Sequence, residues 1–580
     1  MATSDVAPDD ERFPARALNR GVGYPSVNSA RAEYVLATLR DLSATQAAAR
    51  ASVAIREPAS GASTATESTG VAQDLKPHRT RRFWYRDLAM SRWALVGILV
   101  VQVGLSLRLV WSNTAFTDEA LYLWAGRLEW SHWLHGTPIP VFATYFSGAP
   151  VAYPPIGALA NGIGGLAGAR ILSLCFMLTA TALLYGVTQR IFNRNAAVAA
   201  SALFAGLAPT QFLGALATYD AMALMLLALA MWLGIRAAGT SPAARFALLL
   251  AAATALAASD VTKYACLLFD PVIIISIATY GWQQRGRRVG VVCAGALLSG
   301  LAMLLSLALL IGGLTYWQGL KFTTLARAAS NTPASGVLYA SGQWLGGVLL
   351  LTAIGAGAVF AKYRTWPIRC VAIVLCCAVL LAPAEQARIH TITSLFKHVG
   401  FGAWFGCILA GFALVSFTQA VPAVKLRSAI KVAGITALLC ALSGTVLATE
   451  HYSSWPNVTL LMDTLQPILK ATRGPIYVGD SSNNLHYYLG GDVGSRTIIS
   501  PWYFAWTDPA TGKRRYQAAA YADIIRRRYV SVVALNLDVD VPADTDILSA
   551  IAQYGGYRRV AYLPYVLDGT KRGFQVWVRQ

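Results

Sequence analysis

An acidic pair, Asp118 and Glu119, stands in the segment "TDEALYLWAGRLEW", just after the first long apolar run of the chain. One of these two acids could act as a general base, because a positioned carboxylate accepts the proton of an attacking hydroxyl group in the transition state. The simpler structural explanation is a helix cap, in which Thr117 or Asp118 caps the helix and its dipole favours Glu119 in the first turn. The pair alone leaves both explanations open.

Further charged residues lie near the ends of later apolar segments, on the same predicted side of the membrane. Asp220 is the second residue of "YDAMALMLLALAMW", and "SDVTKY" supplies Asp260 and Lys263. Arg108, near the outer end of the first span, belongs to the same group. The remaining members are Arg327 in "LKFTTLARAASN" and Glu385, Arg388, His390, Lys397 and His398 in "EQARIHTITSLFKH". A charge at membrane depth costs about 2.5–3.5 kcal/mol on insertion scales and is usually functional. Snorkelling to lipid phosphate explains each cation singly, but together these residues predict an anion pocket beside a carboxylate.

This combination of charges suits a sugar donor whose leaving group is a lipid phosphate. Lysine and arginine side chains would stabilise the charge that develops on the phosphate, while Asp118 would accept the proton of the acceptor hydroxyl. A free carboxylate, with a pKa of about 3.9, cannot deprotonate an alcohol in the ground state, so proton transfer must accompany attack. We therefore expect direct displacement at the anomeric carbon with inversion. One carboxylate would suffice, unlike the acid and base pair of most glycosidases.

The elements that must position these residues are membrane helices. The chain has 580 residues, of which 56% are hydrophobic and 13% charged, against about 25% charged in an ordinary soluble domain. Apolar runs long enough to cross a bilayer recur from Trp93 to about Ala448. We predict eleven transmembrane helices, at about 93–111, 167–191, 196–216, 221–235, 245–258, 264–280, 289–314, 344–361, 369–383, 399–417 and 430–448.

Basic clusters set the expected orientation. Segments such as "RRFWYR", "QRIFNR", "QQRGRR" and "KYRTWPIR" fall on one side of the predicted spans, and the positive-inside rule makes that side cytoplasmic. We expect a multi-pass protein of the plasma (inner) membrane with its N-terminus in the cytoplasm. This topology also explains much of the net charge of +20 without a nucleic-acid partner. The eight cysteines lie in or beside spans, which predicts neither a structural disulfide nor a cysteine metal site.

The chain divides into three predicted parts. Residues 1–80, with "EPASGASTATESTG", have the composition of a disordered cytoplasmic tail and no signal-peptide pattern. Residues 81–448 form the membrane domain, including a catalytic first outer loop at 112–166. Residues 449–580 form a small extracytoplasmic α/β domain, in which "PIYVGD", "RYVSVVALN" and "GFQVWVR" are expected strands and "AAYADIIRRR" a helix. The predicted fold class is thus a polytopic α-helical membrane protein with a C-terminal α/β domain.

The segments "FTDEALY", "YPPIGALANG", "ARILSLCFMLTATALLYGVTQRIF" and "ATYDAMALMLLALAMWLGIRA" resemble those of the GT-C superfamily of membrane glycosyltransferases. The resemblance covers about residues 94–448 and is strongest to the bacterial branch of protein O-mannosyltransferase-like and lipid A aminoarabinose transferase-like enzymes. It implies that Asp118 is the catalytic base, with Glu119 beside it, and that Asp220 supports the site. It also implies that Lys263 contacts the donor phosphate.

The resemblance leaves several residues with less definite roles. Arg388, Lys397 and Arg327 are further candidates for the donor phosphate, and His390 and His398 for the acceptor or the sugar. Tyr145 and Tyr153 could stack on sugar faces, although aromatic residues at a membrane boundary are often interfacial anchors. The sequence requires no cofactor and contains no ligand pattern that supports a divalent metal.

The C-terminal segment "GDSSNNLHYYLGG" offers Asp480, Asn483, Asn484 and His486 to an acceptor glycan, although a strand, a turn and a helix cap explain it as well. The expected partners are a polyprenyl-phosphate-linked sugar, a cell-envelope glycan, lipid or protein acceptor, and the bilayer. Two other functions remain open. A secondary transporter would place its polar site near the membrane midplane, and a membrane scaffold for cell-envelope polysaccharide assembly would not require the clustered charges.

Overall fold

The computed structural model describes residues 80–325, 331–420, 426–494, 496–499, 501, 504–537, 542–567 and 569–580. Side chains are described from Arg92 onward, except within 417–430. The predicted tail therefore lies outside the described residues, apart from Thr80, and so does Arg327. Within the described chain, nine helices are long and apolar enough to cross a membrane, or ten if the bent pair α11–α12 is one span. The protein is thus a multi-pass membrane protein.

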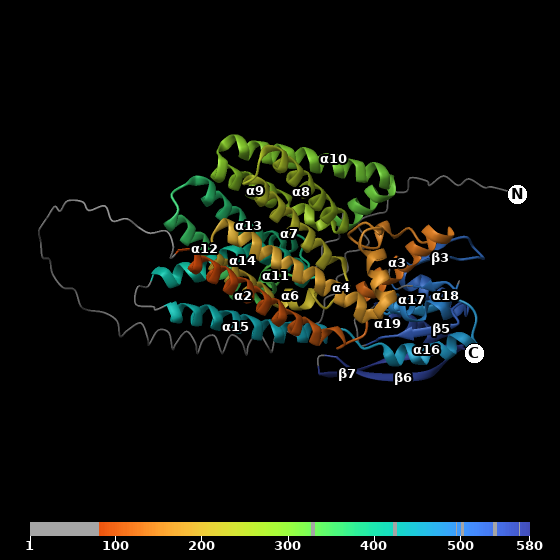
Figure 1. Ribbon diagram of the computed structural model, residues 1–580. Helices are drawn as coiled ribbons and strands as arrows, with labels where there is room; N and C mark the ends of the chain where they lie inside the picture. Colours follow the sequence, from red (N-terminus) through yellow and green to blue (C-terminus); the bar gives the residue numbers. More distant parts are fainter. Residues whose placement is uncertain are drawn as a thin grey trace, which may run out of the picture. The chain divides into compact units, whose positions relative to one another are not determined.

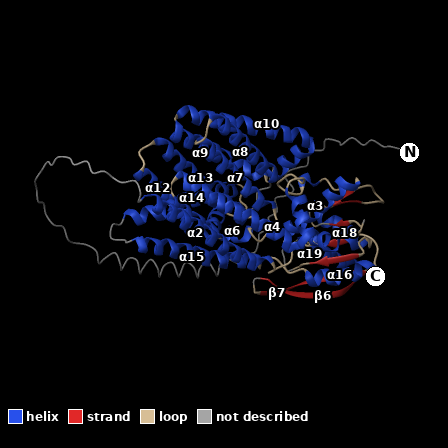
Figure 2. Cartoon of the chain, in the orientation of Figure 1, coloured by secondary structure: helices blue, strands red, loops and turns tan. Residues whose placement is uncertain are grey.

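Helices make up most of the membrane region (Figures 1 and 2). They are α2 (Thr80–Val110), α3 (Thr117–His135), α4 (Tyr153–Ile191), α5 (Arg194–Gly206), α6 (Ala208–Leu213), α7 (Tyr219–Ala238), α8 (Pro242–Thr262), α9 (Asp270–Arg285), α10 (Arg287–Leu320), α11 (Ala334–Leu345), α12 (Gly347–Lys362), α13 (Trp366–Arg388), α14 (Leu395–Ala420) and α15 (Leu426–Tyr452). Three short helical segments join them, at Phe142–Thr144, Tyr264–Phe269 and Lys321–Leu325.

Each of the eleven predicted spans overlaps this helical structure, but the third is not one long helix. Segment 196–216 is divided into α5 and α6 at Leu207, whose ψ of 144° is extended. Pro209 then stands in the first turn of α6, where its missing N–H costs nothing. Neither piece is long enough to count as a span by itself, which accounts for the difference between eleven and ten.

The basic loops gather at one end of the helices. The hydroxyl of Tyr280, near the end of α9, donates to the carbonyl of Arg190 at the end of α4 (3.2 Å). Arg285 donates to the carbonyl of Gly239, just after α7 (3.0 Å). Because α4 and α7 begin at Tyr153 and Tyr219, these two residues lie at the opposite end of the same helices. The charged groups of "QRIFNR" and "QQRGRR" are thus separated by the length of the bundle from Asp220.

The C-terminal region contains a five-stranded sheet with the order β2-β1-β5-β7-β6. The strands are β1 (Ile476–Val478), β2 (Ile498–Ile499), β5 (Val532–Leu535), β6 (Tyr557–Leu567) and β7 (Thr570–Arg579). Strands β1, β2 and β5 are parallel, and β7 runs antiparallel to β5 and β6. The sequence predicted β1, β5 and β7, and α18 (Gln517–Arg526) lies where a helix was expected. Strand β6 was not predicted, because Pro564 and the charged pair Arg558 and Arg559 interrupt the alternating strand pattern.

The remaining elements are α16 (Thr459–Ala471), α17 (Ser482–Val493), α19 (Pro542–Tyr554) and a separate hairpin of β3 (Ala505–Thr507) and β4 (Arg514–Tyr516). Helix α17 follows β1 and packs on α3, the helix that carries the acidic pair. The side-chain amide of Asn484 donates to the carbonyl of Ala115 (2.7 Å), and the Tyr488 hydroxyl accepts from the N–H of the same residue (2.9 Å). The C-terminal region thus holds the segment before Asp118 in place, and Figure 1 shows α17 beside α3.

Asp544 should make the C-terminal region less stable as the pH rises. Burial raises the pKa of Asp544 from its ordinary value of 3.8 to about 6. Between these two values the folded state keeps a proton that the unfolded chain has released, so the free energy of unfolding falls with increasing pH, by about 3 kcal/mol in total. We expect thermal unfolding followed at pH 4.0–6.5 to show this decline, and Asp544→Asn to reduce it. Parallel profiles for the two proteins would contradict the prediction.

Candidate active site

Asp118 lies in the first turn of α3 and forms an ion pair with Lys397 in the first turn of α14. The lysine side chain is 3% exposed and that of Asp118 29%. The helix begins after Phe116, and Asp118 does not cap it. Within the described residues, Oδ2 of Asp118 accepts a hydrogen bond from the ammonium of Lys397. The carboxylate is therefore partly accessible, as a general base requires.

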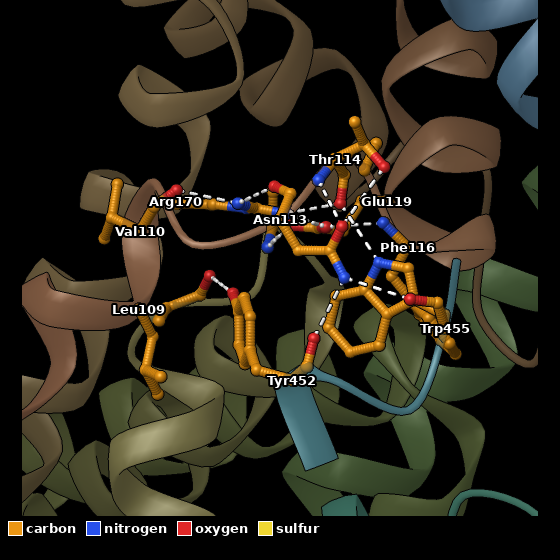
Figure 3. Close-up of polar contacts among 12 residues, drawn as sticks. Leu109, Val110, Asn113, Thr114, Phe116, Glu119, Arg170, Tyr452 and Trp455 are labelled. Carbon is orange, nitrogen blue, oxygen red and sulfur yellow. Dashed lines mark hydrogen bonds and ion pairs between the residues drawn. The ribbon is translucent and has the colours of Figure 1, made fainter. Parts of the chain in front are cut away.

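Glu119 is fully buried and has a different set of contacts (Figure 3). Its Oε1 accepts from Arg170 Nε (2.8 Å) and from the N–H of Ala217 (2.7 Å). Its Oε2 accepts from Arg170 Nη2 (2.7 Å) and from the N–H of Phe116 (2.8 Å). These four bonds fill the approximate lone-pair positions of a carboxylate. Glu119, rather than Asp118, therefore accepts the backbone N–H at the start of α3. Asp118 is not the cap of this helix.

Arg170 extends this network to the segment that leads into α3. Its guanidinium donates to the carbonyls of Val110 (2.7 Å), Asn113 (3.0 Å) and Thr114 (3.1 Å), in addition to Glu119 (Figure 3). The side chain is completely buried. Arg170 is not among the predicted site residues, although a lone arginine inside an apolar span is itself a signal of function or pairing. Arg170 thus connects α4 to the loop before α3 and fixes the backbone next to Asp118.

A second buried ion pair joins Asp220, at the start of α7, to Lys263, at the end of α8. Lys263 Nζ lies 2.6 Å from Asp220 Oδ1, and the Thr218 hydroxyl donates to Asp220 Oδ2 (2.8 Å). The ammonium also lies 4.8 Å from the centre of the Tyr219 ring. That ring stacks on Tyr122, one turn after Asp118 in α3, with 4.7 Å between the centroids. Aromatic contact therefore connects the two ion pairs across α3 and α7.

Arg388, His390 and His398, the other members of the predicted late loop, each contact a different partner. Arg388 is 69% exposed and makes a bidentate pair with Glu385 (2.7 and 2.8 Å), three residues earlier. The ring of His390, which has a positive φ of 53°, lies 3.1 Å from the carbonyl of Thr332. His398 pairs through Nδ1 with the amide of Gln386 (2.6 Å). Among these residues, the ion pair with Asp118 belongs to Lys397 alone.

The two predicted tyrosines have unlike environments. Tyr153 is fully buried in an apolar cluster with Tyr122, Phe142 and Phe146. Tyr145 is 53% exposed, and its ring packs on Phe142 with 5.4 Å between the centroids. Exposure makes Tyr145 the more accessible of the two to a sugar. Their roles in binding stay predictions.

The C-terminal region contributes one acid near Asp118. Asn483 on α17 donates to the hydroxyl of Thr117 (3.1 Å), which places the turn after β1 next to the first turn of α3. Burial and the nearby charge of Asp118 raise the pKa of Asp480 in this turn. His486 stacks on Trp124 with 3.9 Å between the centroids, and burial lowers its pKa to about 4. Of the predicted glycan-binding group, Asn483, Asn484 and His486 thus fasten α17 to α3.

Among the side chains that the structure describes, no group of three or more His, Cys, Asp and Glu residues is arranged to hold a metal ion. Asp118, Glu119 and Asp220 each bind a cationic side chain instead. These contacts are electrostatically suited to an anionic ligand that competes with the carboxylates for Lys263 and Lys397.

The fold matches solved membrane proteins, although no family model and no curated protein sequence matches the chain. The structure of ArnT from Cupriavidus metallidurans in the apo state is similar over 84% of this chain and 98% of that chain, with a TM-score of 0.56 and 15% identity. The structure of the same protein bound to undecaprenyl phosphate covers 86% and 98%, with a TM-score of 0.51 and 14% identity. ArnT is an aminoarabinose transferase. The resemblance to GT-C membrane glycosyltransferases is therefore confirmed for the fold.

Proposed function

We propose that this protein is an inverting glycosyltransferase that moves a sugar from a polyprenyl-phosphate donor to a cell-envelope glycan, lipid or protein. The observation that carries the proposal is the pairing of the partly exposed Asp118 with the buried Lys397, close to the second pair of Asp220 and Lys263. This arrangement supports a base that acts beside two cations. The ArnT structure with undecaprenyl phosphate supports a lipid phosphate as the anion, because the two chains share a fold.

The reaction requires one bond to form and one to break at the anomeric carbon. The acceptor oxygen attacks this carbon, its proton passes to Asp118, and the bond to the phosphate oxygen breaks with the electron pair on the phosphate. Lys397 and Lys263 stabilise that charge. Because a phosphate competes for the ammonium of Lys397, donor binding loosens its pair with Asp118. The base is thus released when the donor is in place.

The buried Glu119 positions the base in this scheme. Since Arg170 and two backbone N–H groups occupy its oxygens, Glu119 fixes the first turn of α3. Asp220 similarly holds Lys263, whereas Arg388 pairs with Glu385 and the ring of His390 lies against the carbonyl of Thr332. We also place the site on the outer face of the membrane, with the C-terminal region, because the basic loops lie at the other end and favour the cytoplasm.

The direct test is sugar transfer by purified protein in lipid nanodiscs. Undecaprenyl-phosphate donors carrying labelled mannose or arabinose would be supplied together with isolated cell-envelope fractions. We expect label to enter an acceptor with the native protein and not with Asp118→Asn. A scaffold would keep its assembly function in the variant, and a transporter would move label across the membrane without forming a glycosidic bond. Mass spectrometry of cell-envelope glycans after deletion of the gene would then identify the product.

Lys263→Met should raise the KM for the donor by about 10- to 100-fold, because a hydrogen bond to a charged group contributes about 1.5–3 kcal/mol. The acceptor KM should change much less. Steady-state kinetics at varied donor concentration measures the effect. An unchanged dependence on donor would contradict the role in phosphate binding.

A paired variant separates this binding effect from a folding defect. Lys263→Met alone leaves Asp220 buried without its cation, whereas the combination with Asp220→Asn removes both charges. We expect the double variant to regain thermal stability but to keep the high donor KM. Arg285→Gln is the matched control, because this exposed arginine donates to the carbonyl of Gly239 at the opposite end of the bundle.

A further inference from the structure

A cavity of about 320 Å³ lies where the ends of α2 and α15 meet the hairpin of β6 and β7. Arg108, Ser112 and Asn113 line it from the end of α2 and the residues after it, and Tyr452 and Trp455 from the end of α15 and the following turn. Val566, near the tip of the hairpin, completes the wall and is 67% exposed. The ends of α2 and α15 lie together, since Arg108 donates to Thr449 and to the carbonyl of Thr445, and Figure 1 shows the hairpin near the end of α15.

Arg108 is the one charged residue among those that line the cavity in the described structure. Its guanidinium donates to the hydroxyl of Thr449 (2.5 Å), the amide oxygen of Gln211 (2.9 Å) and the carbonyl of Thr445 (3.2 Å). These three partners are neutral, and no described acid forms an ion pair with Arg108. Three of the five guanidinium N–H groups are thus used to hold the side chain. Its positive charge remains available to an anion.

The helices that meet at the cavity face lipid. Val100 and Val101 on α2, and Leu439 and Leu442 on α15, are each more than half exposed. Because both helices are long and apolar enough to cross a membrane, we expect these side chains to contact acyl chains. Trp111 is also exposed at the end of α2, as expected for an aromatic residue at headgroup depth. The cavity therefore opens where an apolar surface ends and a fixed positive charge begins.

We propose that this cavity binds the phosphate headgroup of an anionic membrane phospholipid, whose acyl chains lie along α2 and α15. Arg108 binds the phosphate as a charge-assisted donor, Tyr452 and Trp455 flank the glycerol region, and Val566 covers it from the hairpin. The occupant is a bilayer lipid rather than the sugar donor, because the cavity wall contains neither Asp118 nor the two lysines of the candidate active site.

This lipid site is connected to the segment that carries the acidic pair. The side-chain amide of Asn113 donates to the carbonyls of Tyr452 (3.0 Å) and Trp455 (3.1 Å), across the cavity wall. The carbonyl of Asn113 in turn accepts from Arg170, which holds Glu119 (Figure 3). A lipid that fastens α2 to α15 therefore also restrains residues 109–114, immediately before α3.

Native mass spectrometry of the full-length protein, titrated with palmitoyl-oleoyl phosphatidylglycerol, tests the proposal. We expect Arg108→Gln to weaken lipid binding about tenfold, because the substitution removes one charge-assisted contact. The control is Arg285→Gln, which changes an exposed arginine that donates to the carbonyl of Gly239 at the other end of the bundle. This control should bind the lipid like the native protein, and equal binding by both variants would overturn the proposal.

Three further ligands distinguish the chemistry of the occupant. Dioleoylglycerol, which lacks a phosphate, should bind weakly and without dependence on Arg108. Inorganic phosphate should not displace the phospholipid, and undecaprenyl phosphate should not compete for the Arg108-dependent site. Full displacement by either would assign the cavity to a free anion or to the lipid carrier and overturn the proposal.

A second variant keeps the test decisive if Arg108→Gln does not fold. Ser453 lines the cavity and is exposed, so Ser453→Trp should fill the space while leaving Arg108 and its three partners intact. We expect loss of the bound phospholipid. Native-like binding by Ser453→Trp would show that the lipid lies elsewhere.

Discussion

Asp118→Asn should lower the rate of sugar transfer by about 10²- to 10⁴-fold, the usual contribution of a positioned general base. The asparagine amide preserves the size of the side chain but cannot accept the proton of the acceptor hydroxyl. Donor binding should persist, because Lys263 and Lys397 are retained. The measurement is kcat of purified protein in nanodiscs, together with the donor KM and the melting temperature.

The control for this experiment is Asp492→Asn, which changes an acid on α17 that accepts from Gln466 (2.9 Å). Its kcat should equal that of the native protein. A near-native rate for Asp118→Asn would reject this residue as the base. Loss of activity together with a large fall in melting temperature would indicate that the Asp118–Lys397 pair acts mainly in folding.

Arg170→Met should destabilise the membrane region by about 3–5 kcal/mol, the usual effect of removing one partner from a buried ion pair. The substitution leaves the carboxylate of Glu119 without its cation and three backbone carbonyls without their donor. We expect a marked fall in the melting temperature, measured in the same detergent and lipid as the native protein.

Combining Arg170→Met with Glu119→Gln should recover part of this loss, because the buried charge is then gone. The comparison variant is Arg388→Met, which breaks an exposed pair and should cost about 0–1 kcal/mol. If Arg170→Met melted at the native temperature, the network around Glu119 would not be the support of the first turn of α3.

The sequence was sufficient to predict the helical membrane fold and the loops that carry charge. Apolar runs of the required length determine the spans, since a bilayer tolerates few alternatives. Three strands of the C-terminal sheet were also predicted: β1 and β5 are short, buried apolar runs, and β7 has apolar residues at the alternating positions Phe574, Val576 and Val578. The break between α5 and α6 was not predicted, because hydropathy does not distinguish an extended Leu207 from a helical residue in the same apolar segment.

The pairing of charges could not be predicted to the same extent. Arg388, His390 and Lys397 lie within ten residues of one another in the sequence, and their spacing does not reveal which one faces Asp118. The positive φ values of His390 and Ser394 turn the chain between α13 and α14, so that Lys397 enters the bundle while Arg388 faces outward. Arg170 is visible in the sequence as a charge within a span, but its partner Glu119 is 51 positions away.

The ion pair between Asp118 and Lys397 also has a consequence for how the protein is made. Its two residues are 279 positions apart, so at synthesis rates of 5–20 residues per second Asp118 leaves the ribosome roughly 15–60 s before its counter-charge. During that interval the nascent chain contains the proposed base but lacks one of the two lysines proposed to receive the phosphate. If the protein has the proposed function, catalytic competence therefore arrives late in biogenesis, when α14 joins the bundle, and partly inserted chains should be inert toward lipid-linked sugars.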